Sequence, residues 1–167
     1  MSTDWIHCRI DTPLGHMRLA RTAAGLCGAW FEDQRHHPAP DRFTPATEQA
    51  SDTLLQLAHQ QIQAYFKGQH PHFDLPLDLS SGSAFQQQVW HALLGIASGQ
   101  HRSYGDIAKS LNKPQAVRAV GAAVGRNPLS LIVPCHRVLG SAGQLTGYAG
   151  GLDRKRALLQ LEAHPLF

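Results

Sequence analysis

The 167-residue sequence predicts a small α/β domain over residues 1–82, with an antiparallel sheet and a helix, followed by a mostly α-helical domain over residues 83–167. Three observations predict this division. Short apolar segments separated by turn residues occupy the first thirty positions, as strands do. From residue 83 onward, apolar residues recur at helical spacing behind capping residues. Residues 1–82 carry six Lys/Arg and nine Asp/Glu (net −3), whereas residues 83–167 carry nine and three (net +6).

In the first domain, segments 6–10 and 17–20 flank a turn-rich linker and predict a β-hairpin. Residues 25–31 predict a third strand, and the proline-containing segment 34–45 predicts a loop. We expect a helix to begin near Pro45 and to end at Gly68. Its inward face would carry Leu54, Leu57, Ala58, Ile62 and Tyr65. An extended stretch over residues 70–78 would then lead to the domain boundary, at about residues 79–83.

In the second domain, Ser83 is expected to cap a helix that carries Phe85, Val89, Leu93 and Leu94 inward. Ser103 and Asp106 have the spacing of a capping box, which predicts the start of a short helix. The inward residues of this short helix would be Ile107, Ala108 and Leu111.

A tight turn at residues 112–114 would follow, with Pro114 beginning another helix that runs to about Val124. Two helices joined by so short a turn predict a helix-turn-helix, which is winged-helix-like in this setting. Asp153 is expected to cap the last helix, within a charged run, 153–156, that we expect to be solvated or near phosphate rather than catalytic. This helix would carry Leu158, Leu159 and Leu161 inward.

The composition excludes several classes of protein. Apolar residues make up 43% and charged residues 16%, as in a folded globular chain. Three widely separated cysteines (Cys8, Cys27 and Cys135) do not form a disulfide framework, so we expect a reducing, cytoplasmic setting. No apolar run approaches the roughly 18 residues of a membrane span, so no membrane partner is expected. The basic second half indicates a polyanionic partner, with nucleic acid the leading candidate.

One apolar run, residues 131–139, is interrupted by Cys135, His136 and Arg137 in succession. A thiolate is the reactive form of cysteine, and neighbouring cations lower a thiol pKa. A single cysteine in an apolar run is more often a small core residue. The adjacent His and Arg favour chemistry, because burying them without partners is costly. The spacing alone does not decide between these alternatives.

The predicted helix before this run is unusually rich in small and β-branched residues around a single charge, Arg118. Such a helix surface can approach another surface closely. One alternative is tight helix–helix packing. The other is a helix lying shallowly in a DNA groove, where its few hydrogen-bonding side chains favour minor-groove contact over base-edge readout.

Together these motifs resemble the O6-alkylguanine-DNA alkyltransferase family. The resemblance rests on Pro-Cys-His-Arg-Val at 134–138, Gly-Arg-Asn-Pro at 125–128, Ala-Val-Arg-Ala-Val-Gly at 116–121, Ser-Tyr at 103–104 and Gly-Tyr-Ala-Gly-Gly at 147–151. It covers residues 83–163 strongly and the first eighty residues more loosely. The resemblance implies a two-domain fold and a damaged base flipped out of double-stranded DNA.

The resemblance also implies a role for each matching residue at the DNA. Arg118 would fill the gap left in the base stack, and Tyr104 would help to rotate the backbone. The helix would lie on the minor groove through Ala116, Val117, Ala119 and Gly121. The pocket for the flipped base would be built from Cys135, Val138, Tyr148, Ala149, Ser130 and Pro134.

For the chemistry, the resemblance implies that Cys135 is the nucleophile and that His136 takes its proton through a bridging water. Glu162 would orient the imidazole, which is the logic of nucleophile, base and orienting group. Asn127 would brace the turn before the thiol, and Tyr104 would donate to the guanine as it leaves. The thioether product would persist, so a monomer would act once on O6-alkylguanine, or on O4-alkylthymine, without a cofactor.

Some members of the family hold zinc in the first domain. Here Cys8 and Cys27 occur with several histidines. Residues 12–15 resemble the family's amino-terminal hairpin, and this hairpin match puts Thr3 and Thr22 where two cysteine ligands would stand, so we expect no metal. Two other functions remain open: a lesion-sensing module that flips the base without transfer, and a cysteine hydrolase or unrelated helix-turn-helix regulator. The presence of Cys135 disfavours the sensing module. The Tyr104, Arg118 and Asn127 set disfavours the hydrolase and the regulator.

Overall fold

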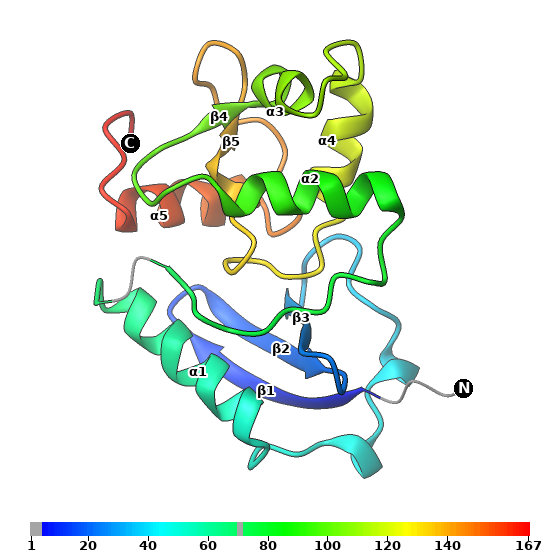
Figure 1. Ribbon diagram of the computed structural model, residues 1–167. Helices are drawn as coiled ribbons and strands as arrows, with labels where there is room; N and C mark the ends of the chain where they lie inside the picture. The colour runs from blue at the N-terminus through cyan, green and yellow to red at the C-terminus, as the bar shows by residue number, and fades with distance from the viewer. Residues whose placement is uncertain (1–4, 70–71) are drawn as a thin grey trace.

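The computed structural model describes residues 5–69 and 72–167 (Figure 1). Its first part is a three-stranded antiparallel sheet with one helix, as expected. The strands β1 (Ile6–Thr12), β2 (Gly15–Arg21) and β3 (Leu26–Phe31) lie in the order β1-β2-β3. The helix α1 (Thr53–Phe66) packs against β1 and β2. The connector expected over residues 70–78 begins at two positions outside the described residues.

Strand β3 is buried over its whole length, and both of its edges are paired. One edge pairs with β2, and the other receives two later segments of the chain. The amide of Leu26 donates to the carbonyl of Pro76 at 2.8 Å, and the amide of Ala29 donates to that of Pro128 at 2.8 Å. The amide of Ser130 donates back to Ala29 at 2.9 Å. The segment that precedes the Cys135 motif is therefore fastened directly to the first part's sheet.

The second part is mainly helical. It contains α2 (Ala84–Leu94), α3 (Tyr104–Ser110), α4 (Val117–Gly125) and α5 (Leu152–Leu161). The short strands β4 (Arg102–Ser103) and β5 (Val138–Leu139) pair in parallel. Short 3-10 turns lie at Pro40–Arg42, Pro45–Thr47 and Cys135–Arg137. Ser83 and Ser103 both form reciprocal capping boxes, which fixes where α2 and α3 begin.

Three predicted helix starts are wrong. Pro45 lies in a 3-10 turn, and α1 begins at Thr53, where the Asp52 carboxylate accepts from the amide of Leu55 at 3.0 Å. Pro114 lies in the segment between α3 and α4, and α4 begins only at Val117. Proline suits the first position of several kinds of turn, so it marks a chain reversal more reliably than a helix start.

The third wrong start is that of α5, for which Gly151 is the N-cap, and Asp153 lies in the first turn without capping it. Three leucines that were expected to face inward are also exposed. These are Leu57 at 41%, Leu94 at 42% and Leu161 at 37%. Helical spacing identifies an apolar stripe, but the neighbours in the fold decide how wide a stripe they cover.

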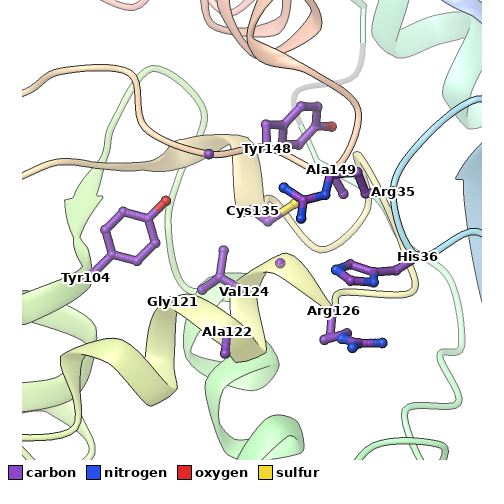
Figure 2. Close-up of a pocket in the computed structure, with 12 residues that line it drawn as sticks. Arg35, His36, Tyr104, Gly121, Ala122, Val124, Arg126, Cys135, Tyr148 and Ala149 are labelled. Carbon is purple, nitrogen blue, oxygen red and sulfur yellow. The ribbon is translucent and has the colours of Figure 1, made fainter.

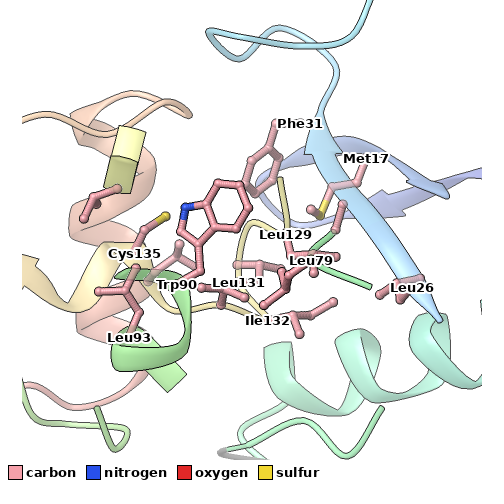
Figure 3. Packing of buried hydrophobic residues seen from close by; sticks show 14 of the residues in the cluster. Met17, Leu26, Phe31, Leu79, Trp90, Leu93, Leu129, Leu131, Ile132 and Cys135 are labelled. Carbon is pink, nitrogen blue, oxygen red and sulfur yellow. The ribbon is translucent and has the colours of Figure 1, made fainter. Parts of the chain in front are cut away.

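One hydrophobic cluster is continuous across both parts (Figure 3). Met17 and Phe31 of the sheet belong to the same cluster as Trp90 of α2 and Leu129 of the following segment. The indole nitrogen of Trp90 donates to the carbonyl of Ala123 at 2.8 Å and ties α2 to α4. The boundary between residues 82 and 83 therefore stays a prediction about architecture, because the core does not divide there. Across the described ranges, no helix has the length and apolarity needed to cross a membrane.

Candidate active site

A cavity of about 370 Å³ opens between α3, α4, the loop after β3 and the loop before α5 (Figure 2). The thiol-bearing residue Cys135 lies in its wall although only 4% of that residue is exposed. Pockets of roughly 300–1,000 Å³ are typical of small-ligand sites. The lining residues are Arg35, His36, Tyr104, Gly121, Ala122, Val124, Gly125, Arg126, Cys135, Gly147, Tyr148 and Ala149.

The Asn127 side chain fixes the loop that carries Cys135. Its amide nitrogen donates to the carbonyl of Val133 at 2.8 Å, and its oxygen accepts from the amide of Leu129 at 2.9 Å. Between these two contacts Leu131 adopts a left-handed backbone with φ of 73°, which is unfavourable for a branched side chain. The buried Asn127 contacts hold that strained turn, and the chain then enters the 3-10 turn Cys135–Arg137.

The residue that follows Cys135 in the chain, His136, is fully buried and paired with Glu162 at the end of α5. Its Nε2 lies 2.9 and 3.1 Å from the two carboxylate oxygens, so this nitrogen carries the proton and donates it. Its Nδ1 is buried and has no hydrogen-bond partner among the described residues. The second ring nitrogen of His136 is therefore left as a free acceptor, as a general base requires.

The Glu162 carboxylate is the centre of a buried charge network. Besides His136, it accepts from Arg137 Nε at 2.7 Å and from Arg137 Nη2 at 2.8 Å. The third nitrogen of Arg137 donates to the carbonyl of Ile96 at 2.6 Å. Burial by itself raises the pKa of Glu162, but the hydrogen bonds from His136 and Arg137 outweigh it and lower the pKa to about 2.

The expectation that neighbouring cations lower the thiol pKa is wrong for this unbound state. Burial raises the pKa of Cys135, and the smaller opposing effects of Asn127 and Lys155 do not overcome it. Burial likewise lowers the pKa of His136, against the pull of Glu162. The Arg137 guanidinium is committed to Glu162 and Ile96. The resting pair is therefore a neutral thiol beside a neutral imidazole.

Lys155 was expected in a solvated run, but it is completely buried. Its ammonium donates to three backbone carbonyls, those of Val138 at 2.6 Å, Thr146 at 2.8 Å and Gly147 at 3.1 Å. Burial lowers the pKa of Lys155 to about 8. This buried cation joins the strand after the thiol to the loop that forms the far wall of the cavity.

Two tyrosines face the cavity. The Tyr104 hydroxyl, at the start of α3, donates to the Thr146 carbonyl at 3.0 Å, and burial raises the pKa of Tyr104. Burial also raises the pKa of Tyr148 well above its usual value. The carbonyl of Ala149 accepts from the amide of Arg35 at 2.9 Å, which attaches this wall to the loop after β3.

Of the residues expected at the site, the structure brings five to the cavity wall: Tyr104, Gly121, Cys135, Tyr148 and Ala149. Ser130, Pro134 and Val138 are buried nearby but do not line it. The Ser130 hydroxyl donates to the Gln34 side chain at 3.1 Å, and the Val138 carbonyl is taken by Lys155. These contacts place them behind the wall, where they support it.

Of the residues expected to meet DNA at or near α4, only Gly121 lines the cavity. Val117, Arg118 and Ala119 are exposed, and Ala116 is partly exposed. The face of α4 that carries Val120, Ala123 and Val124 is buried. The small-residue helix thus has one packed side and one open side.

Sequence reasoning missed several lining residues, chief among them Arg35, His36 and Arg126. Arg35 and His36 come from the loop after β3, far from the Cys135 motif in sequence, and only the fold brings them together. His36 has a positive φ of 59°, which the sequence did not signal. Arg126 belongs to the Gly-Arg-Asn-Pro motif together with Gly125, which also lines the cavity, so the sequence did carry a signal for both.

Cys8 and Cys27 are buried in different hydrophobic clusters. Within the described ranges, no group of three or more His, Cys, Asp or Glu residues is arranged to hold a metal ion. Thr3 lies outside the described residues.

The fold and the cavity define a protein with a cysteine thiol in a cavity wall, followed in the chain by a buried histidine that a buried carboxylate holds. Comparison with known protein families identifies the family to which this chain belongs. The model of the 6-O-methylguanine DNA methyltransferase DNA binding domain matches residues 84–164, and that of the family's ribonuclease-like domain matches residues 7–79. The chain belongs to the 6-O-methylguanine DNA methyltransferase family.

Relatives are similar over nearly the whole chain. A methylated-DNA–protein-cysteine methyltransferase of Mycobacterium tuberculosis is 48% identical over 94% of this chain and 92% of its own length. One from Methanosarcina acetivorans is 43% identical over 91% and 94%. The crystal structure of the Mycobacterium tuberculosis O6-methylguanine methyltransferase superposes with a TM-score of 0.83, at 46% identity over 95% and 92%. The crystal structure of the Mycobacterium tuberculosis protein in complex with DNA superposes with a TM-score of 0.79, at 46% identity over 93% of this chain and 91% of its own.

Proposed function

We propose that this chain repairs double-stranded DNA by direct reversal, transferring the alkyl group of O6-alkylguanine, or of O4-alkylthymine, to Cys135. The observation that carries the proposal is the thiol of Cys135 in a cavity wall, next to a histidine whose Nδ1 is free and whose Nε2 is held by Glu162. Relatives named methylated-DNA–protein-cysteine methyltransferase support it, as does the relative crystallised in complex with DNA.

In the transfer step, Cys135 Sγ attacks the alkyl carbon while the bond from that carbon to guanine O6 breaks. The thiol proton passes to His136 Nδ1 through a bridging water, and Glu162 stabilises the imidazolium that forms. Guanine leaves as the electron pair returns to O6, and it gains a proton from the Tyr104 hydroxyl, which recovers one from His136 through solvent. The net change moves one alkyl group to sulfur and one proton to guanine.

The neutral resting pair suits this chemistry. A buried neutral thiol resists oxidation and nonspecific alkylation by other electrophiles, because the thiolate is the reactive form. Proton transfer to His136 creates a thiolate and an imidazolium together, with Lys155 as a further buried cation whose charge favours the thiolate. The thioether product has no leaving group for water to displace, so each molecule acts once. The DNA lesion itself supplies the alkyl group, so no alkyl-donating cofactor is needed.

We propose that α3 and α4 form a helix-turn-helix whose open side lies on the minor groove. The exposed Val117 and Ala119 allow a close approach, and Arg118 would occupy the gap left by the flipped nucleotide. Tyr104 lies where α3 meets the cavity and would guide the rotated backbone.

The flipped base would enter the cavity between Gly121 and the wall formed by Tyr148 and Ala149. Asn127 keeps the thiol-bearing loop in position for it. The cavity wall is supported by three buried residues that do not line it and that fix its backbone: Ser130, Pro134 and Val138. The three free cysteines suit a reducing compartment, and we propose a cytoplasmic monomer with a domain boundary between residues 82 and 83.

The test is stoichiometric repair of a duplex oligonucleotide with one O6-methylguanine inside a restriction site that cannot be cut while methylated. Cleavable product should equal the amount of protein added and then stop rising. A lesion-sensing module would bind this duplex and leave it uncut. Product that continues to accumulate would contradict single use of Cys135.

A further inference from the structure

The network around Glu162 includes one residue from the first part of the chain. The Tyr65 hydroxyl on α1 donates to Glu162 Oε2 at 3.1 Å, across 97 positions of sequence. Tyr65 is only 3% exposed, and the Glu162 side chain is 2% exposed. Tyr65 is thus a buried phenol whose hydroxyl reaches the carboxylate that holds His136.

Packing alone does not explain this hydroxyl. The Tyr65 ring lies 5.4 Å from the Phe66 ring and 5.5 Å from the Phe73 ring, an environment that a phenylalanine would fill equally well. A buried hydroxyl without a partner costs free energy, so its presence requires a partner. Here the partner is an ionised side chain, and a hydrogen bond to a charged group is among the stronger ones.

The Glu162 carboxylate therefore accepts from three side chains. His136 and Arg137 both follow Cys135 directly, whereas Tyr65 approaches from α1. Each donor withdraws electron density from the carboxylate, so each weakens its attraction for the His136 proton. Each donor also restricts rotation of the carboxylate. Because the His136 imidazole is hydrogen-bonded to that carboxylate, its orientation is restricted as well.

We propose that Tyr65 is a positioning residue for alkyl transfer, which fixes the Glu162 carboxylate and limits how strongly it draws the proton of His136. This inference rests on the proposed function. It gives the first part of the chain a role in the chemistry: α1 supplies the outer donor of a relay whose other members lie beyond residue 134.

The charged and titratable groups around the relay act in known directions. Arg137 and Lys155 disfavour a charged His136, whereas Glu162 favours it. His164, also buried, is influenced by Glu162 and by His101. Among these groups, the Tyr65 hydroxyl forms its hydrogen bond with Glu162, so its removal acts on the others through Glu162. The Tyr65→Phe variant therefore isolates one hydrogen bond.

The experiment measures the second-order rate constant of transfer from free O6-benzylguanine to wild type and Tyr65→Phe over about pH 5 to 9. A small substrate separates the chemistry from DNA binding. Without the Tyr65 donor, Glu162 becomes more basic and stabilises the His136 imidazolium. The acid limb of the profile should therefore move to higher pH, by about half a unit or more. Affinity for unmodified duplex DNA should stay the same.

Two further variants separate positioning from packing. Ile62→Val removes a methylene from the same buried face of α1 without touching a polar group, so its pH profile should match that of wild type. Tyr65→3-fluorotyrosine makes the phenol a stronger donor, so the acid limb should move to lower pH. This variant decides the matter even if Tyr65→Phe does not fold.

Superimposable profiles for wild type, Tyr65→Phe and Tyr65→3-fluorotyrosine would overturn the inference, as would an equal shift for Ile62→Val. A wild-type protein that gains no alkyl group on Cys135 would instead overturn the proposed function. The two failures are therefore distinct.

Discussion

Replacing Glu162 with Gln should destabilise the protein strongly, because it removes the charge that faces the buried Arg137. The side chain of Glu162 is 2% exposed and that of Arg137 is 8% exposed. Removing one partner of such a buried pair costs about 3–5 kcal/mol. The lowering of the Glu162 pKa from 4.5 to about 2 corresponds independently to about 3 kcal/mol. For a chain of this size, about 3 kcal/mol lowers Tm by roughly 6–12 °C.

The pH dependence of this effect has a definite sign. A carboxyl group whose folded pKa is depressed contributes stability above its unfolded pKa, about 4.3, and loses it as pH falls toward the folded value. The difference in free energy of unfolding between wild type and Glu162→Gln should therefore be full at pH 7 and shrink between about pH 5 and pH 2.

Urea unfolding of both proteins at several pH values measures this difference. Glu32→Gln is the matched control, because Glu32 forms an ion pair with Arg9 at 2.6 Å on the surface and should cost less than about 1 kcal/mol. Equal losses for Glu162→Gln and Glu32→Gln would refute the reasoning, and so would a difference that does not change with pH. Alkyl transfer should also slow in Glu162→Gln, with nearly unchanged affinity for DNA.

Three other substitutions test separate parts of the site. Asn127→Ala should lower the free energy of unfolding by about 2 kcal/mol in urea titrations, because it leaves the buried amide of Leu129 unpaired and removes one of the two donors to the Val133 carbonyl. Lys155→Met should cost a similar or larger amount, about 2 kcal/mol or more, by removing the Lys155 donor from the Val138 and Gly147 carbonyls and leaving Tyr104 as the donor to Thr146; calorimetry showing no loss would contradict this. Arg118→Ala should slow repair of duplex DNA more than reaction with free O6-benzylguanine; equal losses on the two substrates would count against its place in the base stack.

The elements that the sequence predicted best are those with local causes. The hairpin, the third strand and the capped starts of α2 and α3 depend on residues that are close together in the chain. The starts expected at Pro45 and Pro114 failed because proline fits several kinds of turn equally well. The exposed Leu57 shows that periodicity alone does not say how much of a helix the neighbours cover.

The candidate site divides in the same way. Cys135, His136 and Asn127 could be singled out because they belong to contiguous motifs. Tyr65 and Arg35 could not, since only tertiary packing brings them to Glu162 and to the cavity.

The burial of individual polar side chains could not be predicted from the sequence either. A thiol beside His136 and Arg137 suggests a low pKa, but Cys135 is desolvated and the guanidinium is turned to Glu162. Lys155 shows the same limit, because a lysine in a charged run gives no sign of being the buried donor to three carbonyls.

The central claim is that Cys135 accepts the alkyl group from DNA. Its most direct test is mass spectrometry of the protein after incubation with a duplex containing O6-methylguanine, followed by peptide mapping. The protein should gain the mass of one CH₂ group, located on the peptide that contains Cys135, and Cys135→Ala should gain none. An unmodified Cys135 peptide, or an adduct that persists in Cys135→Ala, would contradict the account.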